Sequence, residues 1–271
     1  AVRSRYGAPG SNPLKATFVE EIQATLQTNS SDIEFVRERP DVMILIDTLT
    51  LRVEVDVRPV FIYGRYIKNS REIPQTRWPC RSCRGRKGGC EACESSGLQY
   101  LDSVQDLIGR PFVAGMGALD TAFHGMGRED IDVRCLGGGR PFVLEVKSPR
   151  SRSPELSDYE SIISSTCGGR VEVNSLRFSD RKEVARIKQT RSEKTYTIRF
   201  STKETIDEEK ATSLILSLSG VVVEQQTPKR VSHRRADKNR KRRIISVDEV
   251  NFDGEEIEVT LRCEAGTYIK E

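Results

Sequence analysis

The chain has 271 residues, with 44 Lys and Arg against 40 Asp and Glu, and a formal net charge of +4. At ~100–200 residues per domain, this length predicts one large domain or two modest ones. The mean hydropathy of −0.50 excludes a membrane protein, and no apolar run approaches the ~18–20 residues of a membrane span. No apolar signal-peptide core follows a basic start, so a secreted protein is not expected either.

In chain order, the residue patterns predict an α+β protein with a largely antiparallel sheet. The sequence after Pro13 predicts an amphipathic helix with Asn12 as its N-cap, and Ser103 caps a second, short helix at 103–108. A polar, loop-like region of ~30 residues is expected after residue 150. Alternating or apolar runs predict strands at 32–36, 42–46, 51–57, 60–66, 141–146, 170–178, 194–200 and 221–226, a hairpin of 243–250 with 256–265, and helices at 182–188 and 207–218.

The positive charge is concentrated in one segment. Residues 227–243 hold nine Lys and Arg against one Asp, a local net charge of +8, which leaves the rest of the chain near −4. Such a segment is typical of contact with a polyanion. The alternative is a disordered basic tail, but the segment is interior and a new strand pattern follows it.

Four of the seven cysteines form two Cys-x-x-Cys pairs. Cys80 and Cys83 are separated by six residues from Cys90 and Cys93, a spacing that favours a tetrahedral Cys₄ zinc site. With four thiolates and no open position, the zinc would be structural. Redox dithiols are the alternative. Cys135, Cys167 and Cys263 are expected to be small buried residues. The odd cysteine count, without a secretory signal, favours a reducing, cytoplasmic environment.

The segment 127–134, Gly-Arg-Glu-Asp-Ile-Asp-Val-Arg, places carboxylates between two arginines. A carboxylate near cations stays ionised at neutral pH, as a nucleophile must. If the segment is extended, Asp130, Asp132 and Arg134 share one face. A charged strand edge without catalytic function is the alternative from these residues alone.

Four blocks in order resemble one family. Residues 123–145 resemble the catalytic motif of pseudouridine synthases, specifically of the archaeal and eukaryotic tRNA synthase that modifies T-loop uridines 54 and 55. Residues 61–79 resemble the linker into its catalytic domain, residues 226–237 its basic signature, and residues 266–271 its last active-site motif. The first 60 residues resemble the end of its THUMP-containing accessory domain.

The resemblance implies a role for each matching residue. Asp130 is the nucleophile and Arg128 occupies the space left by the flipped base. Tyr196 stacks on the uracil and assists proton removal, Lys270 pairs with Asp130, and Tyr268 and Ile269 line the uridine pocket. The implied RNA-binding residues are Lys229, Arg230, His233, Arg234, Arg235, Lys238 and Arg240.

The resemblance also implies the fold, the domains and the partners. It predicts a pseudouridine-synthase-like mixed sheet with flanking helices, an accessory part at 1–70, a zinc-knuckle insert at 71–100, and a catalytic domain at 101–271. Because the chain starts at Ala1 and stops inside an active-site motif, we expect a C-terminally truncated fragment. We further expect a cytoplasmic monomer that binds the tRNA T-arm and needs structural Zn²⁺ but no cofactor for catalysis.

Two other functions fit parts of the sequence. A noncatalytic zinc-containing RNA-binding module would use the cysteines and the basic segment, with Asp130 in a structural role. A zinc chaperone-like domain would bind peptides, but it leaves residues 123–150 and 227–243 unexplained.

Overall fold

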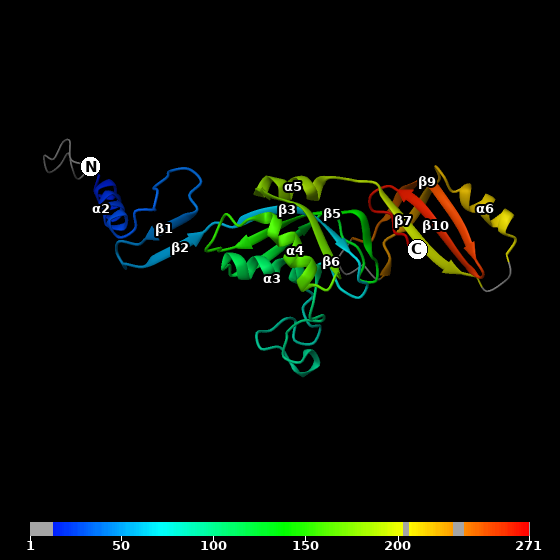
Figure 1. Ribbon diagram of the computed structural model, residues 1–271, viewed down its shortest axis with the longest axis horizontal. Helices are drawn as coiled ribbons and strands as arrows, with labels where there is room; N and C mark the ends of the chain where they lie inside the picture. The colour runs from blue at the N-terminus through cyan, green and yellow to red at the C-terminus, as the bar shows by residue number, and fades with distance from the viewer. Residues whose placement is uncertain (1–12, 203–205, 230–235, 271) are drawn as a thin grey trace. The chain divides into compact units, whose positions relative to one another are not determined.

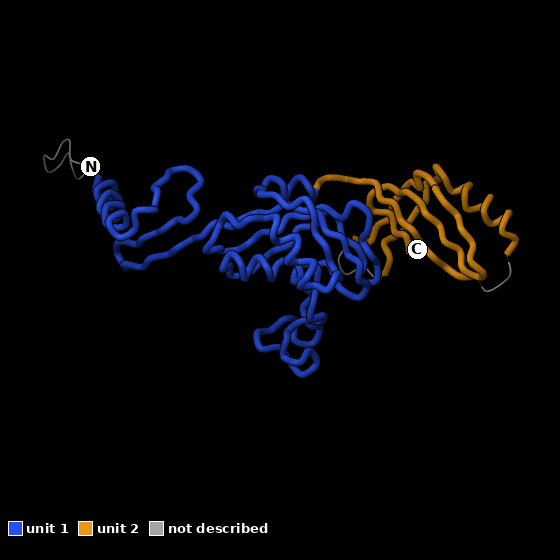
Figure 2. Tube along the Cα trace, viewed as in Figure 1, with its two compact units in different colours: residues 1–188 blue, residues 189–271 orange. Residues whose placement is uncertain are grey.

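The computed structural model describes residues 13–202, 206–229 and 236–270. It consists of two compact units, residues 1–188 and 189–271, which are coloured separately in Figure 2. Each unit contains a four-stranded antiparallel sheet, so the predicted α+β class with antiparallel sheets and flanking helices is confirmed. The predicted boundaries after residues 70 and 100 stay a prediction. Among the described helices, none combines the length and the apolar character needed to cross a bilayer.

The first unit starts with a helix and a hairpin that bury little side-chain surface. These elements are α2 (Leu14–Asn29), β1 (Val42–Ile46) and β2 (Val53–Val57), shown in blue in Figure 1. Pro13 is the N-cap residue of α2, and the predicted cap Asn12 lies outside the described residues. No residue of α2 is buried, and β1 pairs only with β2 within the described chain.

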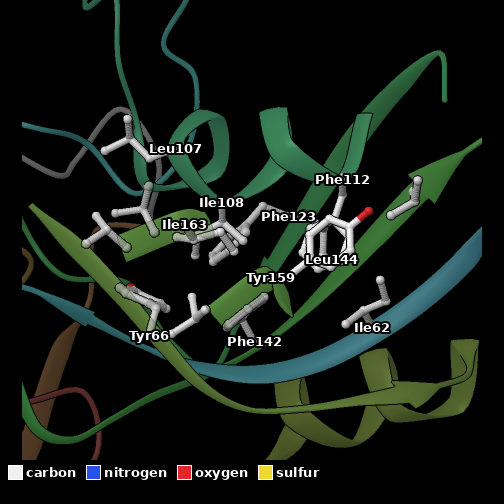
Figure 3. Close-up of a cluster of buried hydrophobic side chains, with 14 of the residues drawn as sticks. Ile62, Tyr66, Leu107, Ile108, Phe112, Phe123, Phe142, Leu144, Tyr159 and Ile163 are labelled. Carbon is white, nitrogen blue, oxygen red and sulfur yellow. The ribbon is translucent and has the colours of Figure 1, made fainter. Parts of the chain in front are cut away.

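The main sheet of the first unit has the strand order β4-β5-β3-β6. Helices α3 (Val104–Met116) and α4 (Leu156–Thr166) cover one face of this sheet, and α5 (Arg181–Gln189) lies on the other, as Figures 1 and 3 show. The elements are β3 (Val60–Lys68), the 3₁₀ turn η1 (Glu91–Cys93), α3 (Val104–Met116), β4 (Asp120–Gly125), β5 (Cys135–Lys147), α4 (Leu156–Thr166), β6 (Val171–Ser179) and α5 (Arg181–Gln189).

Helix α3 forms the centre of the core. Ser103 caps it as predicted, because its side chain accepts a hydrogen bond from the Asp106 backbone N–H at 3.1 Å. Ile108 and Phe112 are fully buried against sheet residues such as Phe142 (Figure 3). Burial of each such side chain stabilises the fold by ~1.5–3 kcal/mol.

A proline inside α3 explains the position of one buried cysteine. Pro111 has no N–H and cannot donate to the carbonyl of Leu107, four residues earlier. The Cys167 thiol donates to that carbonyl instead, at 3.7 Å. Cys167 is buried, as predicted, and it also satisfies a backbone acceptor.

The second unit forms a sheet with the strand order β7-β10-β9-β8. Its core contains Val247, Ile257, Val259, Leu261 and Cys263. Ile215 of α6 packs against this core. The elements are β7 (Lys194–Ser201), α6 (Glu208–Leu216), β8 (Val222–Gln226), β9 (Asn239–Asp253) and β10 (Glu256–Cys263).

Two predicted segments differ from the structure. Residues 32–36 form no strand. The loop-like region after residue 150 contains α4, whose Leu156, Tyr159 and Ile163 are buried. The buried residues of this helix have helical spacing, three and four positions apart. They stand among serines and acidic residues, so the apolar periodicity is too weak to predict a helix. Tyr159 stacks on Phe112 with a ring-centroid distance of 4.1 Å.

Candidate active site

The loop that carries the predicted nucleophile connects β4 to β5. Gly127 begins it with a φ of 77°, which favours glycine. Asp130 is half-buried, and its carbonyl accepts a hydrogen bond from Val133 N at 3.2 Å. The two residues after Asp130 form a turn. The extended conformation in which Asp130, Asp132 and Arg134 share one face is therefore wrong, because this turn interrupts the segment.

A buried lysine holds the backbone of this loop. The Nζ of Lys68, at the end of β3, donates to the carbonyl oxygens of Ile73 at 3.0 Å, Asp130 at 3.3 Å and Ile131 at 3.0 Å. Lys68 is 0% exposed. Burial lowers its pKa, and the nearby charge of Glu129 acts in the opposite direction. The three carbonyl dipoles compensate the buried ammonium group, so the lysine ties the loop to β3.

A buried carboxylate forms the second anchor of the loop. The side chain of Glu129 is 2% exposed, and its Oε2 accepts from Tyr66 Oη at 2.6 Å and Gln75 Nε2 at 3.3 Å. Arg140 Nε lies 3.0 Å from the same oxygen. Gln75 Nε2 also donates to the Gly127 carbonyl at 3.0 Å. Gly127 and Glu129, the two neighbours of Arg128 in the chain, are thus both held by buried side chains.

The pKa of Tyr66 is raised well above 10. Burial is the main cause, and the negative charge of Glu129 adds to it, while Arg140 acts in the opposite direction. Tyr66 is therefore a hydrogen-bond donor throughout the physiological range. It also packs edge-on against Phe123, with a ring-centroid distance of 5.7 Å.

Arg128 occupies the exposed part of the loop. Its guanidinium carbon lies 5.5 Å from the ring centroid of Trp78, within cation–π range. Trp78 belongs to the segment between β3 and α3. The predicted role of Arg128 in the space left by a flipped base stays a prediction.

The other predicted site residues lie in the second unit. Tyr196 is half-buried on β7, opposite Leu261 of β10, and packs against the core of that unit. Tyr268 and Ile269 follow β10, and Ile269 also packs against the core. Lys270 is exposed. Asp130 and Arg128 belong to the first unit and Lys270 to the second, and the predicted pairing of Lys270 with Asp130 stays a prediction.

The four clustered cysteines meet the geometry of a metal site. Their Sγ atoms lie within 4.8 Å of one another. The separations are 3.9 Å for Cys80–Cys90, 3.9 Å for Cys83–Cys93 and 3.7 Å for Cys90–Cys93. Tetrahedral zinc with Zn–S bonds of ~2.3 Å requires S–S separations of about 3.8 Å, so the residues fit the ion.

Backbone groups prepare one thiol of this cluster as a ligand. Desolvation raises the pKa of Cys93, but backbone hydrogen bonds from Cys90 and Gly97 lower it, and the result is about 6. Both N–H groups lie 3.2 Å from Cys93 Sγ. The thiolate, rather than the thiol, is the form that binds metal.

The described part of the basic segment forms the base of a loop between β8 and β9. Lys229 and Lys238 are exposed, whereas Arg240 is half-buried and donates to Thr227 Oγ1 and, at 3.2 Å, to the carbonyl of Ala236. Arg240 thus also supports the shape of the loop. The remaining predicted RNA-binding residues lie outside the described residues: Arg230, His233, Arg234 and Arg235.

The sequence patterns did not identify the residues that hold the Asp130 loop, although β3 contains a signal for one of them, Lys68. Burial alternates along this strand, and Tyr66 and Lys68 continue the buried series that starts with Val60 and Ile62. A lysine at one of these alternating buried positions indicates a buried, hydrogen-bonded cation. Glu129 and Gln75 had no comparable signal, because both lie outside regular elements.

Comparison with known proteins places the chain in one family. The family model described as "Pus10, C-terminal" matches residues 61–271. The protein named tRNA pseudouridine synthase Pus10 from Methanothrix thermoacetophila is 44% identical over 259 residues, which cover 96% of this chain and 56% of that protein. The protein of the same name from Methanocaldococcus jannaschii is 43% identical over 87% of this chain and 51% of its own length.

A third relative, from Korarchaeum cryptofilum, carries the same name and is 37% identical over 100% of this chain and 72% of its own length. The chain spans about half the length of the first two relatives. The family match and the identities agree with the four motif blocks of the sequence. The chain therefore belongs to the Pus10 family.

Proposed function

We propose that the protein is a tRNA pseudouridine synthase with Asp130 as its nucleophile. The observation that carries the proposal is the loop of Asp130, which two buried groups, Lys68 and Glu129, hold in one conformation. The relatives, each named a tRNA pseudouridine synthase, favour the same function. No specific observation favours the noncatalytic alternative or the zinc chaperone.

The proposed reaction is an isomerisation. The bond between uracil N1 and the ribose C1′ breaks, the base turns, and a bond forms between C5 and C1′. The proton on C5 leaves to solvent and N1 gains a proton, so the product has the composition of the substrate. Asp130 acts as the nucleophile, Tyr196 stacks on the base and assists removal of the C5 proton, and Lys270 pairs with Asp130. Tyr268 and Ile269 line the base pocket, and Arg128 fills the vacated space in the RNA.

The zinc of the Cys80, Cys83, Cys90 and Cys93 cluster would be structural. Four thiolates complete the coordination of the ion and leave no position for substrate. The insert between Cys80 and Cys93 also carries Arg81, Arg84, Arg86 and Lys87. The metal would fold this segment and present its cations to RNA.

The substrate we propose is the T-arm of tRNA, with uridine 54, uridine 55 or both as the target. The segment 227–243 and the zinc insert would bind its phosphates, and the part before residue 70 would serve as an accessory RNA-binding part. Phosphate contacts make affinity fall with increasing salt. We further propose that the protein acts as a cytoplasmic monomer and needs no cofactor for catalysis.

The test uses the full-length protein and a tRNA transcript labelled with tritium at uracil C5. Each turnover releases one tritium to water, and chemical mapping of pseudouridine then locates the modified positions. We expect release from the T-arm by the wild type, and loss of about a thousandfold or more in Asp130→Asn. Tritium release at the wild-type rate by Asp130→Asn contradicts the mechanism, and RNA binding without any release by the wild type favours the noncatalytic module.

A further inference from the structure

The side chain of Gln225 forms two hydrogen bonds with the backbone of Tyr268. Gln225 Nε2 donates to the Tyr268 carbonyl oxygen at 2.8 Å, and the Tyr268 N–H donates to Gln225 Oε1 at 2.9 Å. The two residues are 43 positions apart in the chain. Gln225 lies in β8, the strand at one edge of the sheet, and Tyr268 lies beyond the end of β10. The glutamine amide therefore takes the place of a peptide group in a neighbouring strand.

An amide side chain meets both requirements of this contact. It must donate to a carbonyl and accept from an N–H in the same plane, which carboxylates, ammonium groups and apolar side chains cannot do. Both distances are those of good hydrogen bonds. Among the hydrogen bonds of the described residues, these two are the ones that the Tyr268 backbone makes. Gln225 thus fixes a segment that belongs to no strand or helix.

The end of β8 also holds the base of the basic loop. Thr227 lies two residues after Gln225, just beyond the end of β8. Thr227 Oγ1 donates to the Ala236 carbonyl at 2.9 Å, and the Lys238 N–H donates to the same Oγ1 at 3.2 Å. These contacts close the loop and fix the strand end from which Gln225 projects.

We propose that Gln225 is a positioning residue for the base pocket. By fixing the Tyr268 backbone, it sets the place of Tyr268 itself and of the two residues that follow, Ile269 and Lys270. This inference rests on the proposed function of that segment. Misplacement of catalytic or pocket groups by ~1 Å can slow a reaction by as much as 10²-fold.

The test compares Gln225→Met, Gln225→Glu and the control Gln189→Met in the full-length protein. Methionine keeps the length of the side chain and removes both hydrogen bonds, and glutamate keeps the polar shape but cannot donate to the Tyr268 carbonyl. Gln189 is exposed at the end of α5. The readouts are the single-turnover rate of tritium release, the Kd for the tRNA transcript, and hydrogen exchange of the Tyr268 amide.

We expect both Gln225 variants to slow the single-turnover rate by about tenfold or more, with Kd within about threefold of the wild type. In Gln225→Met, the Tyr268 amide loses its acceptor and exchanges faster. Gln189→Met keeps wild-type values. If Gln225→Met fails to fold, Gln225→Glu alone decides the question.

The inference is wrong if the variants react within about twofold of the wild-type rate, or if Kd worsens as much as the rate falls. The Asp130→Asn variant separates this result from a failure of the proposed function. Absence of tritium release by the wild type contradicts the proposed function and an active Asp130→Asn variant contradicts the assigned nucleophile, whereas an active wild type with an inactive Asp130→Asn variant and fast Gln225 variants contradicts only the role of Gln225.

Discussion

The Nζ of Lys68 lies 3.3 Å from the backbone carbonyl oxygen of Asp130, at the centre of the loop that we assign to catalysis. The same ammonium group reaches the carbonyls of Ile73 and Ile131. One buried cation therefore joins the end of β3, the segment after it and the Asp130 loop. The backbone of Asp130, the proposed nucleophile, is therefore held by this lysine together with the Val133 N–H.

Replacing this lysine is expected to weaken both the fold and the reaction. Lys68→Met keeps the aliphatic stem but removes the Nζ donor from three carbonyl oxygens, of which those of Asp130 and Ile131 keep a backbone donor, Val133 N and Glu72 N. We expect the free energy of unfolding to fall by about 2–4 kcal/mol and the rate of tritium release to fall with it. Urea denaturation measures the first effect. Lys182→Met, on the exposed side of α5, is the control, and a Lys68→Met protein as stable as this control contradicts the assignment.

The buried pair of Tyr66 and Glu129 predicts a loss of stability in alkaline solution. The pKa of Tyr66 is raised above 10 in the folded protein, so above about pH 10 the unfolded chain loses its phenol proton while the folded chain keeps it. Below pH 10, Tyr66 makes its full contribution to the free energy of unfolding. Above pH 10 this contribution decreases, by at most ~1.4 kcal/mol per pH unit.

Denaturation of the wild type and of Tyr66→Phe between pH 8 and pH 11 measures this effect. We expect the wild type to be more stable than Tyr66→Phe by about 1–2 kcal/mol at pH 8, because the phenol donates to Glu129. The difference should narrow above about pH 10. A difference that stays constant up to pH 11 shows that the pKa of Tyr66 is not raised.

The cysteine cluster predicts about one tightly bound zinc ion per chain. Cys83→Ser removes one of four ligands and should lower the zinc content of freshly purified protein, measured by elemental analysis. Cys135→Ser is the matched control, because Cys135 lies outside the cluster. Less than about half an equivalent of zinc in the wild type, or equal loss in both variants, contradicts the site.

The basic loop predicts affinity for tRNA that depends strongly on salt. Lys238 is exposed at the base of this loop. If it contacts a phosphate, Lys238→Ala weakens binding and lowers the slope of log K against log salt by about 0.7–0.9. Filter binding at several salt concentrations gives the slope. Lys210→Ala on α6, where the lysine pairs with Asp207, should leave the slope unchanged, and an unchanged slope for Lys238→Ala would exclude that contact.

Much of the fold could be predicted from local patterns. Alternation indicated β3, β7 and β10, and Ser103 marked the start of α3, because these signals depend on neighbouring residues. Helix α4 was missed because its apolar residues are separated by polar ones. The segment 32–36 has a strand pattern but pairs with no described strand, and a strand forms only where a partner completes its hydrogen bonds.

The candidate site was predicted only in part. The motif around Asp130 indicated its chemistry, but the groups that support the loop come from β3 and the segment after it, about 60 positions earlier. Gln225 likewise contacts Tyr268 across 43 positions. Such contacts depend on how distant segments meet, and neither periodicity nor residue spacing contains that information.

The role of Asp130 is tested by comparing Asp130→Asn with Asp132→Asn, two residues apart on the same loop, under single-turnover conditions with saturating full-length protein. We expect Asp130→Asn to bind the tRNA transcript with wild-type affinity but to release tritium at least about a thousandfold more slowly, whereas the release rate of Asp132→Asn stays within about threefold of the wild type. Near-normal release by Asp130→Asn, or equal loss in both variants, would contradict the assignment of Asp130 as the nucleophile.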